Sequence, residues 1–102
     1  QEKVEESSDF ADRVQTSLYT ESRRTNKAIK NRGVKRAPFV VLVGAKMPSV
    51  LAEIGFLTNR REEGMLKRSD YRDKIANALF KGVEQYASTL SQMELAQTGK
   101  SE

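Results

Sequence analysis

Residues 47–59, MPSVLAEIGFLTN, decide the fold that the sequence predicts, and they hold one carboxylate, Glu53, within an otherwise apolar run. An apolar run without polar alternation is typical of a strand covered on both faces, as in a parallel or mixed sheet. A buried charge without a partner is costly. From the residues alone, either Glu53 is satisfied by a cation from elsewhere in the chain, or the fold tolerates it because it does chemistry.

A second strand is expected just before this stretch. Pro38 precedes the apolar run FVVLV at residues 39–43, which Gly44 closes. Parallel neighbours need a long crossover between them, whereas only a short loop separates these two runs. We therefore expect either an antiparallel pair or two strands that lie apart in a larger sheet.

Helices are expected on both sides of these strands. Upstream, apolar residues at helical spacing predict a helix that is capped at Ser7 or Ser8 and ends near residue 21; they are Phe10, Val14 and Leu18. Downstream, Asn59 with Glu62 three residues later is typical of a capping box and predicts a short helix through Leu66. A longer helix is predicted at about residues 70–90, with a broad apolar face made of Ile75, Ala76, Leu79, Phe80, Val83, Ala87 and Leu90.

This order (helix, basic loop, strand, strand, short helix, long helix) predicts the α/β class, as part of a mixed sheet flanked by helices. Two isolated strands are marginal in water, so we expect the pattern to be the end of a larger sheet. Residues 91–102 turn polar and are expected to be a disordered tail.

The composition excludes several kinds of site. The 102 residues include no cysteine and no histidine, so disulfides, thiolate metal sites and imidazole bases are absent. No apolar stretch reaches the roughly 18 residues that cross a bilayer. The chain opens with the charged stretch QEKVEESSD rather than a signal-like segment, and its first residue is Gln1. We expect a processed chain or a fragment.

The net charge of +4 is concentrated in residues 23–36, RRTNKAIKNRGVKR, which hold seven cations and no acid. One interpretation is a solvated, mobile loop. A second is a substrate-facing edge, in which a cation binds a carboxylate through charge-assisted hydrogen bonds. A third is a nucleic-acid surface, which we disfavour because no aromatic residue is interleaved to stack on bases.

The residues also carry a resemblance. The turn RGVK at residues 32–35, the run FVVL at residues 39–42, the string MPSVLAEIGFLTN and the helix start SDYRDKIANAL match, in order and spacing, one family of enzymes. Over about residues 7–87 the chain resembles the C-terminal half of the zinc-dependent N-acetylmuramoyl-L-alanine amidases, which cut the amide between muramic acid and the stem peptide of peptidoglycan.

The resemblance implies a role for three residues. Glu53 matches the family's catalytic glutamate, which takes a proton from the attacking zinc-bound water and passes one to the leaving amine. Arg32 and Lys35 lie in the turn near the family's cleft and are expected to bind substrate. The family holds zinc with two histidines and a glutamate from the preceding half of the domain, so no metal ligand is assigned here. The chain alone is expected to be inactive, with residues 1–90 forming the C-terminal part of a catalytic domain.

The implied parent is a bacterial cell-wall hydrolase of the periplasm or the cell exterior. Its expected partner is peptidoglycan, with an activator protein left open, and its expected duties are peptidoglycan turnover, cell separation or sporulation. No nucleic acid and no transmembrane segment are expected. Two alternatives stay open: a non-catalytic amidase-like module that binds the wall or a partner protein, and a basic nucleic-acid-binding module.

Overall fold

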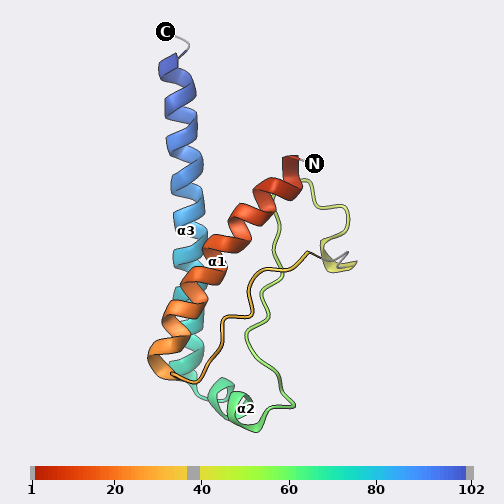
Figure 1. The fold of residues 1–102 in the computed structure, drawn as a ribbon, viewed down its shortest axis with the longest axis vertical. Helices are drawn as coiled ribbons and strands as arrows, with labels where there is room; N and C mark the ends of the chain where they lie inside the picture. Colours follow the sequence, from red (N-terminus) through yellow and green to blue (C-terminus); the bar gives the residue numbers. More distant parts are fainter. Residues whose placement is uncertain (1, 37–39, 101–102) are drawn as a thin grey trace.

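The structure is a computed structural model that describes residues 2–36 and 40–100. Two long helices, α1 (Glu2–Thr25) and α3 (Ser69–Lys100), run antiparallel along one another, and α3 projects beyond the start of α1 (Figure 1). The short helix α2 (Arg60–Leu66) packs at the end where α1 finishes and α3 begins, and a 3-10 turn, η1, spans Val40–Leu42. The molecule is elongated, with extents of 56 × 28 × 21 Å.

The core lies between α1 and α3. Its buried members are Val14, Leu18, Tyr71, Ile75 and Ala78, with Phe10, Ala52, Met65, Leu66 and Leu79 packed around them. Burying a large apolar side chain contributes roughly 1.5–3 kcal/mol, so this single layer of contacts is what holds the helix pair together. The helical stripe predicted in α1 is confirmed.

Helix α1 is longer at both ends than the sequence predicts. It includes residues 7–8, which we expected to cap it, and it continues to Thr25, so that Arg23 and Arg24 lie in its last turn. Cations there interact favourably with the helix dipole, which helps the helix to extend into the basic segment. The Ser7 hydroxyl instead accepts a hydrogen bond from the backbone N–H of Ser49 at 2.9 Å.

The buried face of α3 differs from the predicted one. Ile75 is buried as expected, but Phe80 is 63% exposed and Val83 is 46% exposed. The residues that face α1 include the small Ala78 and Gly82 and the aromatic Tyr71 and Tyr86. Small residues let the two helix axes approach closely. This close approach, rather than the hydrophobicity of the side chains, determines which face of α3 packs against α1.

The predicted fold class is wrong for the residues that the structure describes. They form helices, one 3-10 turn and irregular segments, with no β-strand among them. Residues 29–36 and 49–56 run along one side of α1, but no backbone hydrogen bond joins them. A strand exists only through the ladder it makes with a neighbour, so an apolar, β-branched run is not sufficient to form one.

The first predicted strand, at residues 39–43, is also not formed. Val40–Leu42 is a 3-10 turn in which the Val43 N–H donates to the Val40 carbonyl at 3.1 Å, and Val40 is 87% exposed. Phe39 lies outside the described residues. Among the described helices, none is both long and apolar enough to cross a membrane.

Candidate functional site

The three residues singled out from the sequence line one hollow. It measures about 430 Å³ and lies between one face of α1 and the segments at residues 29–36 and 49–56. Glu53 comes from the second segment, and Arg32 and Lys35 come from the first. The floor is the surface of α1, formed by residues such as Ala11, Val14, Gln15 and Leu18. A carboxylate and two cations therefore share one cavity, although they are 18 to 21 positions apart in the chain.

The first wall is held against α1 by an amide pair. The Gln15 side-chain N–H donates to Asn31 Oδ1 at 2.8 Å, and the same oxygen accepts the Gly33 backbone N–H at 2.9 Å. Gly33 has φ 76°, a left-handed conformation that favours glycine. This turn orients Arg32, whose guanidinium lies 5.3 Å from the centre of the Phe56 ring. The two walls therefore contact one another through a cation–π interaction.

The second wall is fixed at both of its ends. Ser49 donates its backbone N–H to Ser7 of α1, and the Phe56 N–H donates to the Glu62 carboxylate at 2.9 Å. Glu62 belongs to α2, whose N-cap is Asn59: the Asn59 side chain accepts the Glu62 backbone N–H at 3.1 Å. The predicted short helix and its cap are confirmed. In a capping box the Glu62 carboxylate would accept the backbone N–H of Asn59. Here it accepts the Phe56 N–H instead.

Glu53 lies between these anchors and is exposed to solvent, which corrects its predicted burial. Within the described part of the chain no cation lies within the 4.0 Å of an ion pair with Glu53. The interpretation of Glu53 as a buried acid neutralised by the basic segment is therefore wrong. Its carboxylate is accessible for hydrogen bonding or proton transfer with a molecule that enters the hollow.

Gly55 has a packing role in this structure. A Cβ added there would lie 3.3 Å from Leu66 Cδ1, so the missing side chain lets α2 approach the second wall.

These residues do not fit a zinc site. Protein zinc sites use at least three nitrogen, sulfur or oxygen ligands from the protein. The sequence has no histidine or cysteine, and the described residues hold no group of three or more carboxylates that could bind a metal. The other carboxylate on the hollow, Glu62, already accepts the Phe56 backbone N–H, while the Glu62 backbone N–H donates to the Asn59 side chain at the α2 cap.

Comparison with known proteins decides the family. The sequence profile of the family described as N-acetylmuramoyl-L-alanine amidase matches residues 1–85. The chain belongs to the N-acetylmuramoyl-L-alanine amidase family. This amidase family is zinc-dependent and acts on peptidoglycan, and its homologues are cell-envelope enzymes. The resemblance found in the sequence is thus confirmed.

Individual relatives agree with this assignment. The chain is 39% identical over 77 residues to the N-acetylmuramoyl-L-alanine amidase LytC of Bacillus subtilis, covering 76% of this chain and 14% of LytC. It is 43% identical over 58 residues to the N-acetylmuramoyl-L-alanine amidase AmiA of Escherichia coli, covering 57% of this chain and 20% of AmiA. An uncharacterized protein of Bacillus subtilis, YqiI, is 42% identical over 57 residues, covering 56% of this chain and 28% of YqiI.

The chain thus spans between 14% and 28% of the length of these relatives. No solved structure matches it significantly.

Sequence reasoning did not identify the residues that build the hollow, namely Ser7, Gln15 and Asn31. Ser7 was expected to cap a helix. Their partners lie 42 and 16 residues away in the chain, so no local pattern reveals the contacts.

Proposed function

We propose that this chain supplies the catalytic carboxylate and the substrate-binding cations of a peptidoglycan amidase that cleaves the bond between muramic acid and L-alanine. One observation carries the proposal. The chain matches the amidase family over residues 1–85, and Glu53, Arg32 and Lys35 line one accessible hollow.

The proposed chemistry uses these residues in two ways. Glu53 takes a proton from the attacking water and returns a proton to the leaving amine, which is the work of a general base and acid. Arg32 and Lys35 bind carboxylates of the stem peptide through charge-assisted hydrogen bonds. Arg32 is held over Phe56 and presents a fixed guanidinium, whereas Lys35 supplies a mobile point charge.

Because the residues that the structure describes hold no fitting set of metal ligands, we assign no step to zinc on them. We expect the purified chain to bind no zinc with the affinity of a catalytic site and to leave muropeptides uncut. Activity requires ligands that other polypeptide residues supply. The proposed setting is the periplasm or the cell exterior, with peptidoglycan as partner, an activator protein as a further candidate, and wall turnover, cell separation or sporulation as the role.

A chimera tests the proposal. In Bacillus subtilis LytC, the 77-residue stretch that aligns with this chain is replaced by the residues of this chain. If the chain is a working part of an amidase, the chimera cleaves purified peptidoglycan, with release of L-alanine amino termini, and a chelator abolishes the cleavage. A folded, zinc-loaded chimera that releases no such termini would contradict the proposal.

The lack of zinc ligands favours one alternative, a non-catalytic amidase-like module that binds the wall or a partner protein. The same chimera distinguishes the two functions. A module of this kind would leave the chimera bound to sedimented peptidoglycan without cleaving it, whereas the amidase proposal requires turnover.

A further inference from the structure

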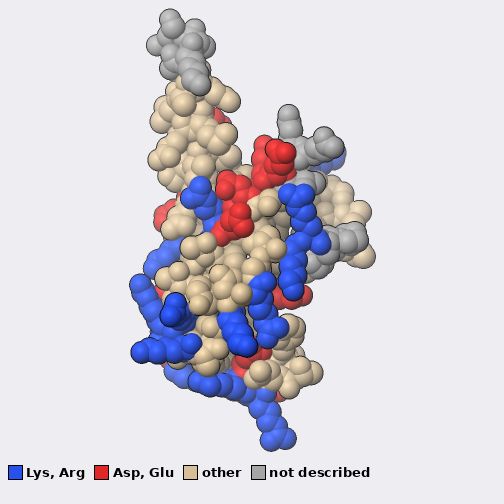
Figure 2. Space-filling model, in the orientation of Figure 1, with Lys and Arg blue, Asp and Glu red and all other residues tan. Residues whose placement is uncertain are grey.

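The net positive charge of the molecule is concentrated at one end. Residues 22–27 and 59–72, which we call the basic pole, hold eight Lys or Arg and three Asp or Glu, a net charge of +5, against +4 for the whole chain. Figure 2 shows this end mostly blue, with red confined largely to the opposite part of α1. Such a concentration of one sign attracts anions and speeds their association.

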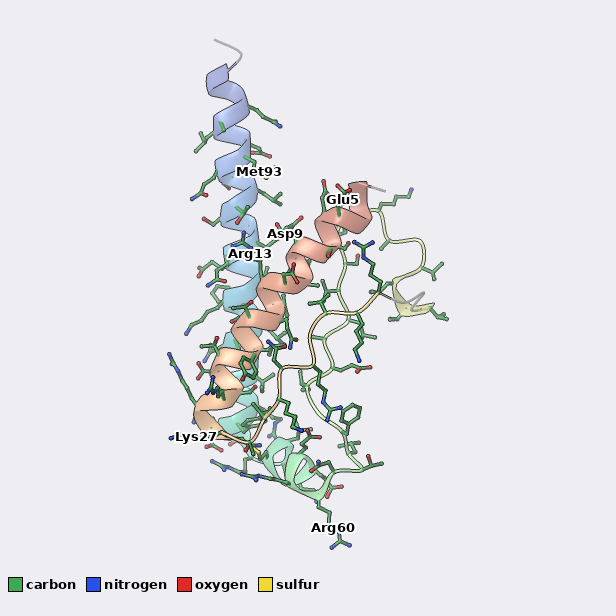
Figure 3. The ribbon with its side chains drawn as sticks, in the orientation of Figure 1. Glu5, Asp9, Arg13, Lys27, Arg60 and Met93 are labelled. Carbon is green, nitrogen blue, oxygen red and sulfur yellow. The ribbon has the colours of Figure 1, made fainter. Side chains whose placement is uncertain are left out.

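The fold assembles the basic pole from three separate elements. The end of α1, the helix α2 and the start of α3 meet there, and Figure 3 shows Lys27 and Arg60 at the same end while Glu5 and Asp9 lie toward the other. The Arg72 guanidinium donates to the Leu66 carbonyl at 2.8 Å and joins α3 to α2. These cations thus lie at one end of the molecule, although Lys27 and Arg60 are 33 positions apart in the chain.

Only part of this charge is neutralised within the chain. Three cations pair with acids, and all three cations are exposed: Arg24 with the half-buried Glu21, Lys67 with Glu63, and Arg68 with Asp70. Exposed pairs of this kind contribute little and exchange readily for another anion. Lys27, Arg60 and Arg61 are exposed and have no acid within 4.0 Å in the part of the chain that the structure describes.

The basic pole offers no exposed aromatic ring for stacking on bases. Its one aromatic residue is Tyr71, which is 4% exposed. Single-stranded nucleic acids are bound by combining a cationic groove with exposed aromatic platforms. The basic pole has the cations but no exposed aromatic ring on which a base could stack. It is therefore better suited to bind a polymer of phosphodiesters that carries no bases.

None of the pole's cations lines the hollow that contains Glu53. We propose that the basic pole is a second binding surface, for a linear polymer of polyol phosphate, which carries one negative phosphodiester in each repeat. Arg60 and Arg61, together with Lys27, contact successive phosphates along this polymer. This inference does not rest on the amidase activity.

Binding of the full chain to poly(glycerol phosphate) at several salt concentrations tests the proposal. The double variant Arg60→Gln/Arg61→Gln should weaken binding at low salt by about tenfold, which corresponds to about 1.4 kcal/mol for the two lost phosphate contacts together. The slope of log Kd against log salt should also become shallower by about 1 to 2, since fewer counterions are released.

The matched control is Lys46→Gln/Lys81→Gln, which removes the same charge from exposed positions outside the pole. It should change the affinity less than twofold, and the helical circular dichroism of both variants should equal that of the parent chain. An equal loss of affinity in both variants would show that overall charge is responsible and would overturn the proposal. So would tighter binding to single-stranded DNA or poly-glutamate of equal charge than to poly(glycerol phosphate).

Discussion

Gly82 of α3 lies directly against Val14 of α1: a Cβ added to Gly82 would be 2.8 Å from the Val14 Cα and 3.2 Å from its Cγ2. Real Cβ atoms do not approach a backbone carbon that closely, so the two helices can cross here only over a glycine. The crossing brings together the α1 and α3 faces that form the core, and α1 is also the floor of the hollow that contains Glu53.

Gly82→Ala should therefore destabilise the chain. Overpacking of a core costs typically 1–3 kcal/mol, and the gain in helix propensity of up to about 1 kcal/mol offsets it only in part. We expect a net loss of about 1–2 kcal/mol in the free energy of unfolding, measured by urea denaturation. The matched control is Gly64→Ala in α2, where a Cβ meets nothing within 4 Å. That change should stabilise or be neutral, and an equal loss in both variants would contradict the packing argument.

Tyr86→Phe should stabilise the chain near neutral pH. The Tyr86 ring stacks on Phe10 with centroids 4.8 Å apart, while its buried hydroxyl has no hydrogen-bond partner in the described structure. Phenylalanine keeps the ring and removes the unsatisfied group, which costs about 1 kcal/mol or more when buried. Thermal or urea unfolding measures the difference. A variant less stable than the parent would indicate that the hydroxyl has a partner.

The stability of the folded chain should depend on pH through the same tyrosine. Burial, and then the nearby carboxylates Glu6 and Asp9, raise the pKa of Tyr86 above its ordinary value. As the pH rises, the unfolded chain loses the Tyr86 hydroxyl proton before the folded chain does. The stability that comes from the raised pKa is therefore present below about pH 10 and is lost as the pH rises through the raised pKa. Tyr86→Phe should reduce the fall in stability above pH 10, measured by urea unfolding at a series of pH values.

Asn59→Ala should unravel the start of α2. The Asn59 side chain accepts the Glu62 N–H, and loss of such a cap typically costs about 1 kcal/mol. Because Glu62 also accepts the Phe56 N–H, the second wall of the hollow should loosen with the helix. Amide hydrogen exchange at Glu62 and Phe56 should accelerate, while exchange within α1 stays unchanged. Asn59→Asp, which retains an acceptor, should restore the protection.

Arg68→Gln should raise the pKa of Asp70. The Arg68 guanidinium donates two hydrogen bonds to Asp70, at 3.1 and 2.6 Å, and these hold the pKa of that carboxyl below its usual value. The associated stability is present at neutral pH and is lost as the pH falls through the lowered pKa. A carboxyl NMR titration measures the shift, and Lys67→Gln, which leaves the pair intact, should not alter it.

The sequence predicted where the three helices lie, because each one is encoded by residues close together in the chain. The expected disordered tail is wrong for residues 91–100, which continue α3 to Lys100. The spacing of Val14 and Leu18 marks the buried side of α1, and the Asn59 cap begins α2 where expected. The face of α3 was misjudged because Gly82 and Ala78, which contribute little apolar surface, permit the close approach that leaves Phe80 exposed.

The prediction of two strands was wrong for a different reason. The β-branched run Val40–Leu42 and the stretch at residues 49–56 have strand composition, but a ladder needs a paired neighbour, and none of the described residues supplies one. The resemblance to amidases singled out Glu53, Arg32 and Lys35, and the structure places all three on one hollow. It could not reveal that Gln15 and Asn31 hold that hollow together, because their contact forms only in the folded chain.

The most direct test of the account is the turnover number of the LytC chimera with Glu53→Gln, measured on purified peptidoglycan beside a Glu63→Gln control. Glu63 is a carboxylate of α2 that pairs with Lys67 and does not line the hollow. If Glu53 transfers protons, kcat should fall by about 10²- to 10⁴-fold. Zinc content and KM should stay near those of the unmodified chimera, and Glu63→Gln should retain full activity. A Glu53→Gln chimera that turns over at the rate of its Glu63→Gln counterpart would contradict the assignment of Glu53 as the catalytic carboxylate.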